Sequence, residues 1–329
     1  MEQKSLIKGV AYAALSLLFV SFQPIIANAR PEELDAFLFA AATCIVEALV
    51  FFPMLIIETK ILKKRMKNKQ IGKKADKKNI LLDKKFLHPF EKLKDHKLFL
   101  IYIGLNFGIA QVLFFIAYRL AGAINGSLAQ QTTIIFGLLF GFLILKEKPN
   151  LIQIIFSFIL LFGLIFAVTK GKFNIIELNF GVILMVFVTA MWMIAHSLSR
   201  DVFSQDKITP IQLAFIRNVI SGLFLIIFYI LFFPITNLAL ILKPINLLFM
   251  VLMGVDYALD IFLWYNSLKY IEVSKATVLV SPMPIITAFF AFVILGEIFT
   301  IYHFIGAFII IMSIIVIVSQ KSKTPKLDH

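Results

Sequence analysis

Cysteine and charge are both scarce in this chain of 329 residues. The single cysteine, Cys44, permits no internal disulfide, and its place in an apolar run indicates a packing role. Charged residues make up only 16% of the sequence, against about a quarter in an ordinary soluble domain. A further 60% are hydrophobic, too many for one water-soluble domain to bury, whereas a bilayer takes roughly 20 per spanning helix. The composition predicts a polytopic membrane protein.

Motifs for soluble catalysis are also missing. The sequence has no glycine-rich phosphate loop, no zinc-ligand spacing and no nucleophile motif. We therefore expect no enzyme activity, no metal and no cofactor.

Basic residues, in contrast, are concentrated in one segment. Fifteen Lys or Arg and five Asp or Glu lie between Glu58 and Lys97, which accounts for most of the net charge of +13. Aromatic residues that could stack on bases are few in this segment, so nucleic-acid binding is not favoured. We interpret residues 58–97 as a solvated cytoplasmic loop beside anionic lipid.

Apolar stretches long enough to cross a membrane recur ten times. They cover residues 6–29, 34–57, 98–118, 124–145, 150–169, 181–203, 210–233, 245–267, 274–295 and 301–319. With the N-terminus in the cytoplasm, 26 of the 32 Lys and Arg fall on the cytoplasmic side. We expect a multi-pass protein of the cell membrane with both termini in the cytoplasm.

A repeat of fixed offset divides the chain. Shifting the sequence by 150 aligns residues 98–170 with 248–320 without a gap, so that Gly104 matches Gly254 and Glu147 matches Glu297. Each unit then has five helices. Because five is odd, the two units enter the membrane from opposite sides, and a substrate site is expected between them near the midplane. The predicted architecture is all-α, with inverted five-helix repeats in residues 1–170 and 171–329.

Several stretches of the second repeat resemble a known family. Ser274-Lys275-Ala276-Thr277 leads to Ser281-Pro282-Met283-Pro284, followed by Leu295-Gly296-Glu297 and Gly306-Ala307. These resemble the final helix pair of EamA-like members of the drug/metabolite transporter superfamily. The first repeat departs from the family pattern at two places. It has Lys146-Glu147 where Gly-Glu is typical, and Phe39 near the position where family members often have an arginine. The resemblance implies a ten-helix carrier that exports as often as it imports, and it leaves the cargo undefined.

The eighth span carries two acids. Asp256, Asp260 and Trp264 are spaced by four and share one helix face, and an ionised Asp at a helix centre costs about 2.5–3.5 kcal/mol. Asn106 is equivalent to Asp256 in the first repeat, with Gln111 on a nearby turn. These residues form either a polar substrate-binding floor or a set of interhelical hydrogen bonds.

Other polar side chains within the spans are candidates for binding or coupling. Glu47, at the centre of the second span, is predicted to carry a coupling proton, with an interhelical pair as the alternative. Arg217 is interpreted as structural. Trp192 and His196 share a face of the sixth span, where His196 is either a proton relay or a hydrogen-bonded structural histidine.

Two further spans have polar or proline-rich stretches at matching positions. Gln130 and Gln131 belong to a polar cluster in the fourth span that can hydrogen-bond a zwitterion or sugar. Pro282 and Pro284 interrupt the analogous part of the ninth span, which is tolerated mainly beside a cavity. Glu147 and Glu297 lie at helix ends and are interpreted as turn or interface residues.

Four functions are compatible with the sequence, and one of them is a purely structural or receptor-like membrane protein, which would show no substrate-dependent flux. The leading hypothesis is a secondary carrier for a small polar or amphipathic metabolite, such as an amino acid or amine, with proton coupling. Exchange of nucleotide-linked metabolites requires inward cations, of which Arg217 and Lys275 are the available ones. An intramembrane prenyl-transfer enzyme would use Asp256 and Asp260 to hold magnesium, but it requires a second acid cluster.

Overall fold

A computed structural model describes residues 2–71, 96–146, 148–174, 179–204, 208–267, 270–271 and 273–320. Helices make up all the regular elements of these ranges. In chain order they are α1 (Glu2–Ala29), α2 (Ala36–Ile71), α5 (Lys97–Ala121), α6 (Ala123–Gln130), α7 (Thr133–Leu145), α8 (Leu151–Val168), α9 (Phe180–Ser204), α10 (Pro210–Phe232), η2 (Ile235–Leu242), α11 (Pro244–Ser267), α12 (Val273–Val280), α13 (Met283–Phe290), η3 (Ala291–Leu295) and α14 (Ile301–Ser319).

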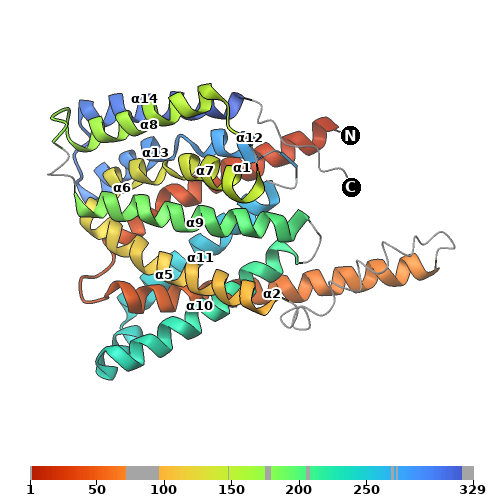
Figure 1. The fold of residues 1–329 in the computed structure, drawn as a ribbon. Helices are drawn as coiled ribbons and strands as arrows, with labels where there is room; N and C mark the ends of the chain where they lie inside the picture. The colour runs from red at the N-terminus through yellow and green to blue at the C-terminus, as the bar shows by residue number, and fades with distance from the viewer. Residues whose placement is uncertain are drawn as a thin grey trace.

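Ten helical segments within the described ranges are long and apolar enough to cross a membrane. They lie roughly side by side, and α9 runs opposite to α1, so the second repeat is inverted relative to the first (Figure 1). The predicted all-α fold with two inverted five-helix repeats is confirmed.

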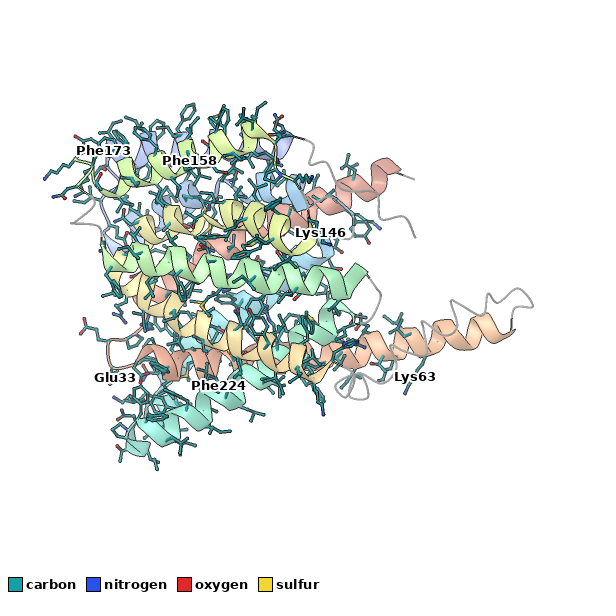
Figure 2. The ribbon with its side chains drawn as sticks, in the orientation of Figure 1. Glu33, Lys63, Lys146, Phe158, Phe173 and Phe224 are labelled. Carbon is teal, nitrogen blue, oxygen red and sulfur yellow. The ribbon has the colours of Figure 1, made fainter. Side chains whose placement is uncertain are left out.

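The two ends of the bundle differ in charge. Lys63 and Lys146 lie at the end where α1 begins, α14 ends and α2 projects, which we call the basic end (Figure 2). Glu33 and Phe173 lie at the other end, which we call the opposite end (Figure 2). Which end faces the cytoplasm stays a prediction from the distribution of Lys and Arg.

The helices pack in pairs that repeat the symmetry of the sequence. Helix α1 packs on α11 while α5 packs on α9, and α2 packs on α10. We call α5, α6, α7 and α9 the first helix group, and α1, α11, α12 and α13 the second helix group. Helices α2 and α10 contact both groups, whereas α8 and α14 pack against each other at the edge of the bundle (Figure 1).

The fourth and ninth spans are broken at equivalent positions. The ninth breaks at Ser281 and Pro282, as the prolines predict, and the fourth breaks at Gln131 and Thr132 without any proline. In the fourth span the Thr132 hydroxyl donates to the carbonyl of Ala129 at 2.8 Å, and neighbouring amides bond three residues back instead of four. Side-chain hydroxyls that occupy backbone carbonyls compete with the regular helix.

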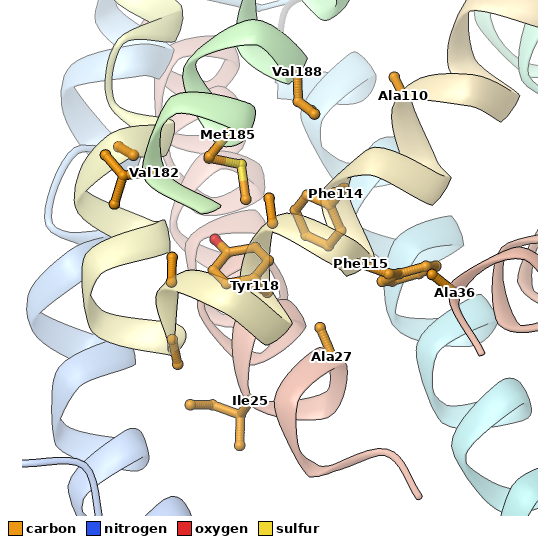
Figure 3. Packing of buried hydrophobic residues seen from close by; sticks show 14 of the residues in the cluster. Ile25, Ala27, Ala36, Ala110, Phe114, Phe115, Tyr118, Val182, Met185 and Val188 are labelled. Carbon is orange, nitrogen blue, oxygen red and sulfur yellow. The ribbon is translucent and has the colours of Figure 1, made fainter. Parts of the chain in front are cut away.

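Small residues let the helices of the first helix group approach one another closely near the opposite end. A side chain at Gly126 would approach the Tyr118 ring to 2.5 Å, and one at Gly181 would lie 2.5 Å from the backbone nitrogen of Ala121. Figure 3 shows Ile25 and Ala27 of α1 near the Tyr118 ring of α5. Close backbone approach of this kind replaces the hydrophobic effect as the packing force between helices in lipid.

The second helix is longer than the sequence indicates. The predicted span ends at residue 57, but α2 continues to Ile71 and projects from the basic end (Figure 1). Lys, Arg, Met and Gln are strong helix formers, and the first glycine of this stretch is Gly72, so the charged residues extend the helix that the apolar residues begin. The remainder of the predicted basic loop, residues 72–95, lies outside the described residues.

Candidate functional site

The two acids of α11 face α1. The carboxylate of Asp260 accepts hydrogen bonds from the Ser16 hydroxyl at 2.5 Å and from the Gln23 side-chain amide at 3.1 Å. Asp256, one turn earlier, is only 8% exposed, and its Oδ2 has no hydrogen-bond partner. Gln23 also lies against Asp256. The four-residue spacing therefore brings both acids to the polar side chains of α1, with Ser16 and Gln23 beside Asp260 and Gln23 beside Asp256. Oδ2 of Asp256 is left unpaired.

Trp264 continues the same helix but lies in different surroundings. Its half-buried ring packs in a small apolar cluster with Ala13, Ile271 and Ala276. It is thus part of the apolar contact between α1, α11 and α12.

Glu47 lies at the centre of a second polar cluster. It is 1% exposed and accepts hydrogen bonds from the side-chain amides of Gln111 at 3.0 Å and Asn218 at 2.9 Å. The Cys44 thiol donates to the Gln111 amide oxygen at 2.9 Å. Three helices, α2, α5 and α10, thus supply one hydrogen-bonded network around a single carboxylate.

Arg217 faces this network as well. Its Nη2 lies 3.9 Å from Oε2 of Glu47, and its guanidinium lies 4.1 Å from the centre of the Phe107 ring. Its Nε has no hydrogen-bond partner, although the side chain is only 4% exposed. The half-buried His196 meets the same Phe107 ring edge-on, with ring centres 5.4 Å apart. Burial opposite a carboxylate agrees with the structural interpretation of this arginine.

The position equivalent to Asp256 in the first repeat is also incompletely paired. Asn106 is 9% exposed, its amide nitrogen is 3.4 Å from the Tyr102 hydroxyl, and its Oδ1 has no partner. Both repeats thus hold a buried polar oxygen without a hydrogen-bond donor at the same position. A buried unpaired acceptor costs about 1–3 kcal/mol, which a bound ligand or water would recover.

Tyr257 connects the two polar clusters, and sequence reasoning missed it. Its buried hydroxyl has no hydrogen-bond partner and lies within electrostatic range of Glu47, Asp256 and Asp260. Its ring contacts Phe114 of α5 edge-on at 5.7 Å between centres. The available signal was its spacing of three from Asp260, which places both on neighbouring parts of one helix face.

Ser16 and Gln23 were missed too. They are seven residues apart and both buried, so they share one face of α1. Two buried polar residues on one face of a mostly apolar span were the signal that could have indicated a partner for the acids.

The predicted polar residues of the fourth span are used at the helix break. The Tyr118 hydroxyl donates to the Gln130 amide oxygen at 2.6 Å, and the Gln131 amide nitrogen lies 3.7 Å from the sulfur of Met283 on α13. The half-buried ring of Trp192 is 5.5 Å from that of Phe114. These residues connect the broken span to the aromatic rings of Phe114, Trp192 and Tyr257, which we call the aromatic wall.

An inverted repeat, two broken spans at matching positions and buried carboxylates between the repeats define a membrane transporter. The sequence profile of the EamA-like transporter family matches residues 7–169 and 179–319. The chain belongs to the EamA-like transporter family.

Two further comparisons concern one relative in sequence and one likeness in fold. An uncharacterized transporter of Methanothermobacter thermautotrophicus (strain Delta H) is 25% identical over 232 residues, which is 69% of this chain and 65% of that relative. The chain thus matches just under two thirds of the relative's length. One crystal structure of another protein superposes with a TM-score of 0.57 at 13% identity, over 95% of this chain and 96% of that one, and this likeness concerns the fold alone.

Proposed function

We propose that this protein is a secondary transporter that moves a small polar or amphipathic metabolite with an amine group by alternating access. The observation that carries the proposal is the acid pair of α11. Asp256 and Asp260 are held between α1 and α11, and Oδ2 of Asp256 has no donor in the described structure. An ammonium group supplies both the positive charge and the N–H donors that this site lacks.

The charge balance of the site supports a cationic group. Glu47 has Arg217 opposite it at 3.9 Å, so this carboxylate already faces a positive charge. The hydrogen bonds of Asp260 come from neutral side chains, Ser16 and Gln23. Because isolated carboxylates in a membrane are costly, we infer that Asp256 and Asp260 receive their counter-charge from substrate or from protons.

An aromatic wall supports an amphipathic substrate. The centre of the Phe114 ring lies 5.5 Å from that of Trp192 and 5.7 Å from that of Tyr257, whose hydroxyl is within electrostatic range of the acid pair. Apolar walls with a few well-placed polar groups are typical of small-molecule sites. In this proposal Asn106, Gln130, Gln131 and His196 complete the polar lining, and Trp264 borders the site on the α12 side.

The coupling proton can be carried at either of two places. The sequence-based prediction assigns it to Glu47, whose two oxygens accept hydrogen bonds from Gln111 and Asn218. Donors of this kind stabilise the ionised carboxylate, as does Arg217. We therefore favour the Asp256–Asp260 pair as the proton carrier and Glu47 as the partner of Arg217. Variants described in the Discussion separate these roles.

The alternatives have less support. Recognition of a nucleotide phosphate requires a free cation, but Arg217 already faces Glu47, and the side chain of Lys275 lies outside the described residues. Prenyl transfer with magnesium requires a second acid cluster, and Asn106 stands where the repeat would place it. In our proposal the basic end faces the cytoplasm, and the lysines of α2 lie beside anionic lipids of the cell membrane.

A ligand panel tests the proposed function. We would measure the melting temperature of the purified protein in detergent with amino acids, amines, nucleosides, sugar nucleotides and prenyl diphosphates with magnesium, because a ligand that binds only the folded state raises it. A shift with an amine-bearing compound that disappears in Asp260→Asn, followed by flux in proteoliposomes, is the expected result. A magnesium-dependent shift with prenyl diphosphate alone would overturn the proposal.

A further inference from the structure

Glu297 bonds to the start of a helix that belongs to the other repeat. It follows the ninth span at the opposite end, and its Oε1 accepts the backbone N–H of Ala123 at 2.6 Å while Oε2 accepts that of Ile124 at 3.0 Å. These are the first two amides of α6, which no helical carbonyl can satisfy. The carboxylate also faces the positive end of the α6 dipole. One side chain therefore joins the second helix group to the first.

The backbone at Gly122 is shaped for this contact. Gly122 has a φ of +80°, and a Cβ there would lie 3.1–3.3 Å from the carboxylate atoms of Glu297. A side chain would be strained by the dihedral angle and crowded by the carboxylate. The junction of α5 and α6 is thus fitted closely to Glu297.

Arginines reinforce the connection at the same end. Arg30, just beyond α1, is 5% exposed and donates to the carbonyl of Phe115 on α5 at 3.2 Å, while Arg119 donates to the carbonyl of Arg30 at 2.9 Å. Burial, with Arg119 nearby, lowers the pKa of Arg30 to about 10, so it stays charged at neutral pH. Both contacts join α1 of the second group to α5 of the first.

The junction is coupled to the interior of the bundle. The hydrogen bond from Tyr118 to Gln130 ties α5 to α6, and Gln131 at the end of α6 lies against Met283 of the second group. A separation of α6 from Glu297 would therefore also separate Gln131 from Met283. That contact lies at the paired helix breaks, where Gln131 belongs to the polar lining of the proposed site.

We propose that Glu297 is a positioning residue for transport, which keeps the site closed at the opposite end and releases the amides of α6 when the site opens there. The inference rests on the proposed alternating-access function. It does not depend on the identity of the substrate. Glu147, which the offset of 150 makes equivalent to Glu297, lies outside the described residues.

Cysteine labelling tests the role of Glu297. In a Cys44→Ala background, which is free of native thiols, Gln131→Cys reports whether the contact with α13 opens. A membrane-impermeant maleimide is added at the opposite end of oriented proteoliposomes. We expect Glu297→Gln to accelerate labelling about tenfold or more over the parent, because two charge-assisted hydrogen bonds are weakened. Glu297→Asp, which keeps the charge on a shorter side chain, should fall between them.

A second carboxylate at the same end provides the matched control. Glu33 binds Lys243 and Asn246, which adjoin α11 of the same helix group as α1, so Glu33→Gln should leave labelling unchanged. Melting temperature and gel filtration establish that each variant is folded, and Glu297→Asp replaces Glu297→Gln if the latter is not. Equal labelling of the parent and a folded Glu297 variant overturns the inference, as does equal acceleration by Glu33→Gln. Labelling requires no substrate, so a negative result leaves the proposed function intact, whereas absence of any flux would count against that function alone.

Discussion

Glu47 and Asp256 are buried carboxylates and Asp260 is a half-buried one, all within spans, but their surroundings differ. Each oxygen of Glu47 has an amide donor, and Arg217 faces it. Asp260 has two neutral donors, and Oδ2 of Asp256 has none. Arg217 also attracts Asp260, but its ion pair among the described residues is with Glu47. We therefore call Glu47 the balanced site and the Asp256–Asp260 pair the unbalanced site. The complete set of partners supports our proposal of a structural role for Glu47, and the incomplete set supports the proposed binding role of the acid pair.

The largest expected effect comes from breaking the balanced site. Glu47→Gln leaves the buried guanidinium of Arg217 without its counter-charge, which should lower the free energy of unfolding by about 3–5 kcal/mol. The neutral double variant Glu47→Gln/Arg217→Gln should recover most of this loss. Thermal unfolding of the purified proteins in detergent measures both. A single variant that melts like the parent and loses the pH dependence of transport would instead favour Glu47 as the proton carrier.

Next in size is the effect of changing the unbalanced site. Asp260→Asn should weaken binding of an amine substrate about 10- to 150-fold, since a hydrogen bond to a charged group contributes about 1.5–3 kcal/mol. Its melting temperature without ligand should change little or rise. Isothermal titration with the compound found in the panel measures the affinity. Unaltered affinity in both Asp260→Asn and Asp256→Asn would remove the acid pair from the site.

A smaller effect should follow from moving α11 away from α2. A Cβ at Gly254 would lie 2.5 Å from Cβ of Val46, so Gly254→Ala should destabilise the protein by about 1–3 kcal/mol and also weaken substrate binding. Gly163→Ala crowds Ile309 at 2.8 Å in the peripheral α8–α14 pair. This control should lower the melting temperature without lowering affinity. Equal losses of affinity would show that general destabilisation, and not the spacing of α2 and α11, explains the result.

The smallest effect concerns a carboxylate outside the spans. Hydrogen bonds from Lys243 and Asn246 lower the pKa of Glu33 below its ordinary value of 4.5. A carboxyl whose pKa is lower in the folded state stabilises the protein above the unfolded pKa, and this contribution disappears as pH falls through the folded value. The difference in melting temperature between the parent and Glu33→Gln should therefore be small at pH 7, shrink as the pH falls below about 4.5, and vanish once the pH is below the lowered folded pKa. A difference that persists in acid would require another cause.

Much of the fold could be predicted because the bilayer restricts it. The length of an apolar stretch determines whether it can span the bilayer. A sequence repeat offset by 150 residues, with an odd number of spans in each unit, determines an inverted repeat. The break in the ninth span was visible in Pro282, since proline cannot donate to the helix ladder. The break at Thr132 was not predicted, because it depends on a hydroxyl bonding its own helix.

The candidate site was only partly predictable. Residues of unusual cost, such as Glu47 and Asp260, were recognisable from hydropathy alone, whereas Ser16, Gln23 and Tyr257 are common enough in spans to attract no notice. Their importance arises from the elements that they face. Trp264 shows the converse, since its spacing places it with the acids while its ring packs against apolar residues of α1 and α12.

The sequence by itself determined the membrane-spanning helices, their inverted arrangement and the presence of costly acids inside them, because these follow from local hydropathy and periodicity. Only the tertiary structure decided which acid is compensated. Arg217 and Glu47 are 170 residues apart in the chain, and Asp260 is more than 230 residues from its partners Ser16 and Gln23 on α1. No local pattern specifies pairs at such separations. Pairing between distant helices is set by how the two repeats pack, and that packing gives both oxygens of Glu47 a donor while it leaves Oδ2 of Asp256 without one.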